Sequence, residues 1–139
     1  MSRRLFMAAL AVIVAGAGYG WYRTHRMETP QKAAPVVGFE TLKGRWLRAD
    51  GGYILEVRNL DASGKLDAYY FNPRSIHVAK AEASMQGTTL RVFVELRDVN
   101  YPGSTYRLTY DAVSDRLVGD YFQAALNQTF DVVFERSAP

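Results

Sequence analysis

The 139-residue sequence contains no cysteine. This absence excludes disulfide frameworks, thiolate zinc sites, iron–sulfur clusters and a cysteine nucleophile. Histidine is almost as scarce, because the region 43–139 contains only His77. The sequence also lacks the Gly-x-Ser-x-Gly nucleophile elbow of serine hydrolases. A lone histidine supports neither a Ser–His–Asp triad nor a histidine zinc site. We therefore expect no enzymatic activity, no cofactor and no metal.

Net positive charge is missing from most of the chain. The region 43–139 has 12 basic and 12 acidic residues, so the overall net charge of +3 comes from residues 1–42. A protein that binds nucleic acid needs a basic face to displace counterions from phosphates. We therefore expect no nucleic-acid partner.

Residues 5–22 carry no charge and are flanked by arginines on both sides. As a helix this segment would be about 27 Å long, close to the thickness of the hydrocarbon core. It could be a secretory signal cleaved after the small residues 15–17. We favour an uncleaved membrane anchor, in which Tyr19, Trp21 and Tyr22 form an interfacial aromatic belt. In both cases the rest of the chain is exported to the periplasm or the cell exterior.

Three segments follow from this pattern. Residues 1–26 are the membrane anchor or signal segment. Residues 27–42, with prolines and a glycine, form a linker. Residues 43–139 form the exported domain, where apolar and polar residues alternate with the period of a half-buried strand.

Short turn sequences divide this domain into eight expected strands. Their approximate ranges are 43–49, 52–58, 64–71, 75–84, 88–97, 104–111, 116–123 and 128–136. Short connections favour antiparallel neighbours, and closing the sheet removes its exposed edges. We predict an all-β fold, an eight-stranded antiparallel up-and-down meander barrel preceded by one N-terminal transmembrane or signal helix. In the late part of the strand 75–84, from Lys80 to Ser84, a bulge could switch the apolar face.

The predicted inward-facing residues include many aromatic rings. They are Trp46, Tyr53, Leu55, Val57, Leu66, Ala68, Tyr70, Ile76, Val78, Leu90, Val92, Val94, Leu96, Tyr106, Leu108, Tyr110, Leu117, Gly119, Tyr121, Phe130, Val132 and Phe134. An eight-stranded barrel has an interior that side chains can just fill, or that holds one small ligand. The sequence leaves both possibilities open.

The sequence Gly44-Arg45-Trp46, together with Arg136 near the end of the chain, resembles the lipocalin and avidin group of small barrels. Gly64-Lys65-Leu66 followed by Tyr69-Tyr70 is similar to the third-strand region of avidin-like barrels. The resemblance implies that Trp46 is buried at the closed end with Arg136 packed over it. No ligand-binding residue of that group has a counterpart here, so the resemblance informs fold and not function.

The meander topology places alternate connections at the same end of the barrel. One end, remote from the linker, collects the longer loops, which are rich in amides, arginine and tyrosine. We predict a ligand-binding site there, formed by Asn72, Arg74, Asn100, Tyr101 and Gln123.

Two functions remain open. The first is a membrane-anchored exported β-barrel module of the cell envelope, with an interaction or structural role and no catalysis. Its membrane contact would be through residues 5–22, and a protein partner or a second copy would bind through outward-facing Phe71, Phe93 and Phe122. The alternative is a lipocalin-like carrier of a small apolar or aromatic ligand. An open cavity of a few hundred cubic ångströms would favour the carrier.

The fate of the N-terminal segment is testable by mass spectrometry of the mature protein. We expect residues 1–22 to be retained, because an aromatic belt and flanking arginines serve an anchor. A mature protein that starts near Gly18 would instead identify a cleaved signal.

Overall fold

A computed structural model describes residues 37–138, which contain one short 3-10 helix and nine strands. The helix is η1 (Phe39–Leu42). The strands are β1 (Gly44–Arg48), β2 (Tyr53–Leu60), β3 (Leu66–Asn72), β4 (Arg74–Ile76), β5 (Val78–Gln86), β6 (Thr89–Asp98), β7 (Tyr101–Asp111), β8 (Arg116–Gln123) and β9 (Gln128–Ser137). All neighbouring strands are antiparallel, which confirms the predicted all-β meander. The predicted N-terminal helix and membrane segment 5–22 lie outside the described residues. Within 37–138, no helix has the length and apolar character needed to cross a membrane.

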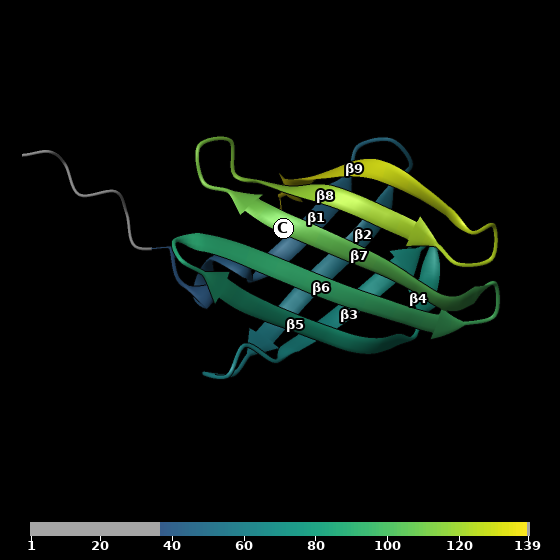
Figure 1. Ribbon diagram of the computed structural model, residues 1–139, viewed down its shortest axis with the longest axis horizontal. Coiled ribbons are helices and arrows are strands. Elements are labelled where there is room, and N and C mark those ends of the chain that lie inside the picture. The colour runs from purple at the N-terminus through teal and green to yellow at the C-terminus, as the bar shows by residue number, and fades with distance from the viewer. Residues whose placement is uncertain (1–36, 139) are drawn as a thin grey trace, which may run out of the picture. The chain divides into compact units, whose positions relative to one another are not determined.

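The sheet curls into a nearly closed barrel because β1 pairs with both β2 and β9 (Figure 1). The strand order is β4-β3-β2-β1-β9-β8-β7-β6-β5. The first and last long strands of the meander are therefore neighbours, as the closed topology requires. Consecutive strands lie side by side around the whole barrel, except at one seam.

At this seam the described part of the chain has one more strand than predicted, nine instead of eight. The segment expected to be one strand, 75–84, is divided at His77 into β4, which pairs with β3, and β5, which pairs with β6. The backbone of His77 is held by Asp98, whose Oδ2 accepts from its N–H at 2.8 Å, and by the N–H of Arg97, which donates to its carbonyl. The register of β5 shifts between Val78 and Lys80, so the irregularity comes just before the segment 80–84 in which it was expected.

The barrel is joined across the seam by few backbone contacts. The N–H of Ala83 donates to the carbonyl of Gly64 at 2.7 Å, and Lys65 forms an isolated bridge with Glu82. Gly64 has φ +92°, and a Cβ there would lie 2.1 Å from the carbonyl oxygen of Ala83. Only glycine allows the two strands to approach so closely at this point.

One end of the barrel is closed around Trp46, as the resemblance to small barrels implied. The indole is fully buried, and its Nε1–H donates to the carbonyl of Leu42 in η1 at 2.9 Å. The guanidinium of Arg136 lies 4.1 Å from the centre of the indole ring. Arg136 also forms an ion pair with Asp115 at 2.7 Å and donates to the carbonyls of Lys43 and Thr41. These contacts tie η1 and both ends of the meander to one side chain.

Most of the predicted inward-facing residues are buried or half-buried. Phe130 is an exception, since 42% of it is exposed. It follows the same alternation as buried Val132 and Phe134, but it lies near the start of β9, where the barrel is open. The prediction missed two buried polar residues, Arg48 and Ser104.

The seam can be tested by comparing Gly64→Ala with Gly87→Ala. Both glycines have positive φ, 92° and 63°, so each alanine is expected to cost about 1–2 kcal/mol of backbone strain. A Cβ at Gly87 meets nothing within 4 Å, whereas at Gly64 it meets the backbone of Ala83. Urea unfolding followed by circular dichroism should therefore show the larger loss of stability for Gly64→Ala. Equal losses would contradict a close strand approach at the seam.

Candidate functional site

An open cavity of about 790 Å³ lies at the barrel end opposite the one that is closed around Trp46. We call it the mouth cavity. It is lined by the ends of strands and by the connecting turns: Arg48, Asp50, Tyr53, Tyr70, Asn72, Arg74, Ile76, Val99, Asn100, Tyr101, Tyr121, Gln123, Thr129, Phe130 and Asp131. Its volume is within the range typical of small-molecule sites, about 300–1,000 Å³.

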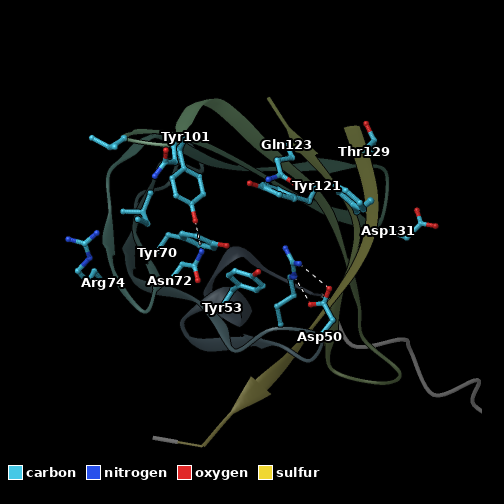
Figure 2. Close-up of a pocket in the computed structure, with 15 residues that line it drawn as sticks. Asp50, Tyr53, Tyr70, Asn72, Arg74, Tyr101, Tyr121, Gln123, Thr129 and Asp131 are labelled. Atoms are coloured by element: carbon cyan, nitrogen blue, oxygen red, sulfur yellow. Dashed lines mark hydrogen bonds and ion pairs between the residues drawn. The ribbon is translucent and has the colours of Figure 1, made fainter. Parts of the chain in front are cut away.

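The structure brings all five predicted site residues to the mouth cavity. Asn72 donates from Nδ2 to the hydroxyl of Tyr101, which links the end of β3 to the start of β7. Gln123 lies across the cavity from Asn72, whereas the side chain of Arg74 points away from it (Figure 2). Asn100 occupies the turn before β7 with φ +68°. Their role in ligand binding remains a prediction.

The centre of the site is Arg48, which the sequence analysis did not select. It is a charged residue that is only 8% exposed. Its Nε and Nη2 donate to the two carboxylate oxygens of Asp50 at 2.6 and 3.0 Å. Its guanidinium lies 4.1 Å from the ring centre of Tyr53 and 5.5 Å from that of Tyr121. The charge is therefore neutralised by a carboxylate on one edge and contacted by aromatic rings.

The alternation along β1 contained the signal for this residue. Trp46 faces inward, and the residue two positions later must face the same side. Arg48 is that residue, and Asp50 follows two positions after it in the turn to β2. A basic residue at an inward position, with an acidic residue in the next turn, is a pattern that could have been recognised from the sequence.

Below Arg48 the barrel is filled by aromatic rings. Arg48 donates from Nη1 to the hydroxyl of Tyr106 at 2.9 Å, and the hydroxyls of Tyr106 and Tyr70 lie 2.8 Å apart in a hydrogen bond. The Tyr106 ring stacks on Tyr121 with centroids 4.5 Å apart and meets Phe134 edge-on at 5.3 Å. The interior is thus divided between a packed aromatic floor and the open mouth cavity.

The protonation states of the floor are fixed by burial and by these hydrogen bonds. Burial raises the pKa of Tyr106 to about 12 and also raises that of Tyr70, so both hydroxyls remain protonated at neutral pH. Burial alone would lower the pKa of Arg48, but the hydrogen bond to Asp50 and the interactions with Tyr106 raise it overall. The hydrogen bond from Arg48 is the largest cause that lowers the pKa of Asp50. The floor therefore contains a permanent cation and two neutral hydroxyls.

Nothing in the described residues assembles a metal centre. Within 37–138, no group of three or more His, Asp or Glu side chains is placed to hold a metal ion. The exposed His77 lies at the seam, where its backbone makes the hydrogen bonds described above.

Comparisons with protein-family models, with curated proteins and with solved structures found no match to this chain. Function must therefore be argued from the geometry of the site itself.

The ion pair between Arg48 and Asp50 predicts an acidic titration midpoint for Asp50, below its usual value of 3.8. The stabilisation from this pair is present above the pKa of the unfolded chain and is lost as pH falls through the lower pKa of the folded protein. Carbon-detected NMR should show this midpoint, and Arg48→Met should raise it.

The control is Arg58→Met, which removes an arginine that pairs with Glu56 on the outer face. It should leave the Asp50 midpoint unchanged. A midpoint that is the same in wild type and Arg48→Met would show that Arg48 does not hold the carboxylate.

Proposed function

We propose that this protein is an exported, membrane-anchored β-barrel that binds a small molecule in its mouth cavity and does not catalyse a reaction. The observation that carries this proposal is the open cavity of about 790 Å³ above a packed aromatic floor. Of the two functions considered from the sequence, this is the carrier, and its lipocalin-like character is part of the proposal.

The walls of the cavity support a ligand with both apolar and polar parts. Tyr53, Tyr101 and Tyr121 contribute ring surface together with hydroxyl groups. Asn72 and Gln123 contribute amides that can both donate and accept hydrogen bonds. Such a lining is more polar than a purely apolar ligand needs, so we propose an aromatic ligand with polar substituents.

The rigidity of the barrel supports binding with little cost in ordering the protein. Part of the wall comes from paired strand ends, and Arg48 is fixed through three of its donor groups. A preformed site loses less conformational entropy when a ligand binds.

Anchoring and export rest on the sequence of residues 5–22 and their flanking arginines. In this proposal the anchor keeps the barrel at the outer side of a membrane, where its cavity can take up a molecule from the periplasm or the exterior.

A second role, in which a protein partner or another copy binds the outer face, stays a prediction. The side chains proposed for it, Phe71, Phe93 and Phe122, are half-buried in the isolated chain. They lie on β3, β6 and β8, which are not neighbours in the sheet. The exposed Val118 pairs with Val133 on β9, which gives the outer face an apolar contact of its own.

Ligand retention tests the proposed function. The full chain in lipid nanodiscs is incubated with a small-molecule extract of the source cells, washed and denatured, and released compounds are identified by mass spectrometry. We expect wild type to retain a specific compound, and Gln123→Trp to lose it because the indole takes up space that the ligand needs. The control Arg107→Trp introduces the same side chain at an exposed position on the outer face.

The control should retain the compound to the same extent as wild type. The proposed function fails if wild type retains no more than empty nanodiscs. It also fails if Gln123→Trp retains the same compound at the same level.

A further inference from the structure

We propose that the ligand presents an oxygen acceptor, a carboxylate or a carbonyl on a planar aromatic body, to the hydroxyl of Tyr70 and the free N–H groups of Arg48. This inference rests on the proposed function and specifies the chemistry that the floor of the mouth cavity recognises. The observations that carry it are the hydrogen bonds made by Arg48, Tyr106 and Tyr70. We call these three residues the donor chain.

The donor chain has more hydrogens than acceptors. A guanidinium carries five N–H hydrogens and each tyrosine hydroxyl carries one. Arg48 donates two to Asp50 and one to Tyr106, so one hydrogen on Nη1 and one on Nη2 have no acceptor among the described residues. The Tyr106–Tyr70 bond uses one hydroxyl hydrogen and leaves the other free.

The position of the two tyrosines decides which hydroxyl hydrogen should be free. If Tyr70 donated to Tyr106, the remaining hydrogen would belong to Tyr106, which is fully buried and does not line the cavity. A buried donor without a partner costs about 1–3 kcal/mol. If Tyr106 donates to Tyr70, the remaining hydrogen belongs to Tyr70, which is also buried, with 1% exposed, but lines the cavity, where a ligand oxygen can accept it. The favoured direction therefore runs from Arg48 through Tyr106 to Tyr70 and into the mouth.

This direction also strengthens the last donor. A hydroxyl that accepts a hydrogen bond from a cation becomes a better donor, because successive bonds polarise one another. Arg48 donates to Tyr106, and Tyr106 passes this polarisation to Tyr70. Tyr70 thus offers the cavity a donor that remains protonated, since burial raises its pKa.

Aromatic rings line the cavity around this donor and favour an aromatic body behind the oxygen. The Tyr53 ring is nearly parallel to that of Tyr70, with 10° between their planes, and Tyr101 meets Tyr70 edge-on. Figure 2 shows Tyr53, Tyr70 and Tyr101 on the same side of the cavity, across from Tyr121. The guanidinium of Arg48 already lies near Tyr53 and Tyr121, so an aromatic ligand would contact the parts of these rings that face the cavity.

Asp50 allows the carboxylate and carbonyl forms to be distinguished. Its carboxylate is largely exposed, with a side-chain exposure of 58%, while the side chain of Arg48 is only 10% exposed. The negative charge of Asp50 opposes a ligand carboxylate and has little effect on a neutral carbonyl. Removing this charge should therefore strengthen binding of an anionic ligand only.

The experiment compares 4-fluorobenzoate, 4-fluorobenzamide and 4-fluorobenzamidine, which have the same ring and differ in the group presented to the floor. Fluorine NMR line broadening measures their affinities for the full chain in nanodiscs, with empty nanodiscs as the reference. We expect the benzoate or the benzamide to bind, and the benzamidine, which is a cationic donor, to bind at least tenfold more weakly than the tighter of the two.

Tyr70→Phe and its control Tyr110→Phe locate the contact, and Asp50→Asn tests the charge of the bound group. Tyr70→Phe removes the terminal hydroxyl and should weaken the acceptor probes about fivefold to tenfold, the effect of a hydrogen bond of about 1–1.5 kcal/mol. Tyr110→Phe removes a hydroxyl at the closed end, where it donates to Asp115, and should leave the affinities unchanged. Asp50→Asn should strengthen binding of the benzoate, which is anionic, and leave that of the neutral benzamide unchanged.

The inference is overturned if the benzamidine binds as tightly as the acceptor probes. It is also overturned if none of the three probes binds, or if Tyr70→Phe binds the acceptor probes as tightly as Tyr110→Phe. In each case a specific compound retained by wild type and lost by Gln123→Trp would still support a ligand site. The proposed function and this inference can therefore fail separately.

Discussion

The pairing of β1 with β9 is the interaction on which the rest of the structure depends. It joins the beginning and end of the meander and gives the sheet an inside and an outside. Because side chains alternate along a strand, this closure places both Trp46, in the middle of β1, and Arg48, at its end, in the interior. One five-residue strand thereby supplies both the plug of the closed end and the charge of the open end.

The interior is used in two ways along its axis. Around Trp46 the space is occupied by side chains, and Arg136 covers the indole from outside. Tyr70 packs against Tyr106 with centroids 5.6 Å apart and also lines the cavity, so it marks the boundary between the two parts. Apolar burial in the lower part provides the main driving force for folding, so the upper part is free to have polar groups arranged for binding.

Much of the fold could be predicted from the sequence, because alternation and turn residues are local signals. Residues such as Leu90, Val92 and Val94 identified their strand and its buried face. The division at His77 could not be predicted, because it depends on which neighbour each half of the segment pairs with. The five predicted site residues could be identified because the meander topology brings their connecting loops together at one end of the barrel. Arg48 could not be recognised from apolar alternation alone, because it is a charged residue at an inward position of β1. The placement of Tyr106 beside Tyr70 depends on strands far apart in sequence, so no local pattern gives it.

The seam has a consequence for how this protein behaves among other copies of itself. Strands with free edges offer backbone groups to which other chains can add, and natural sheets discourage this with short edge strands and charges. Here one edge strand, β4, has only three residues. The other, β5, carries exposed Lys80 and Glu82, which form an ion pair at 3.3 Å near Lys65 on the opposite side of the seam. The incomplete closure of the barrel is thus accompanied by features that protect its edges against intermolecular aggregation.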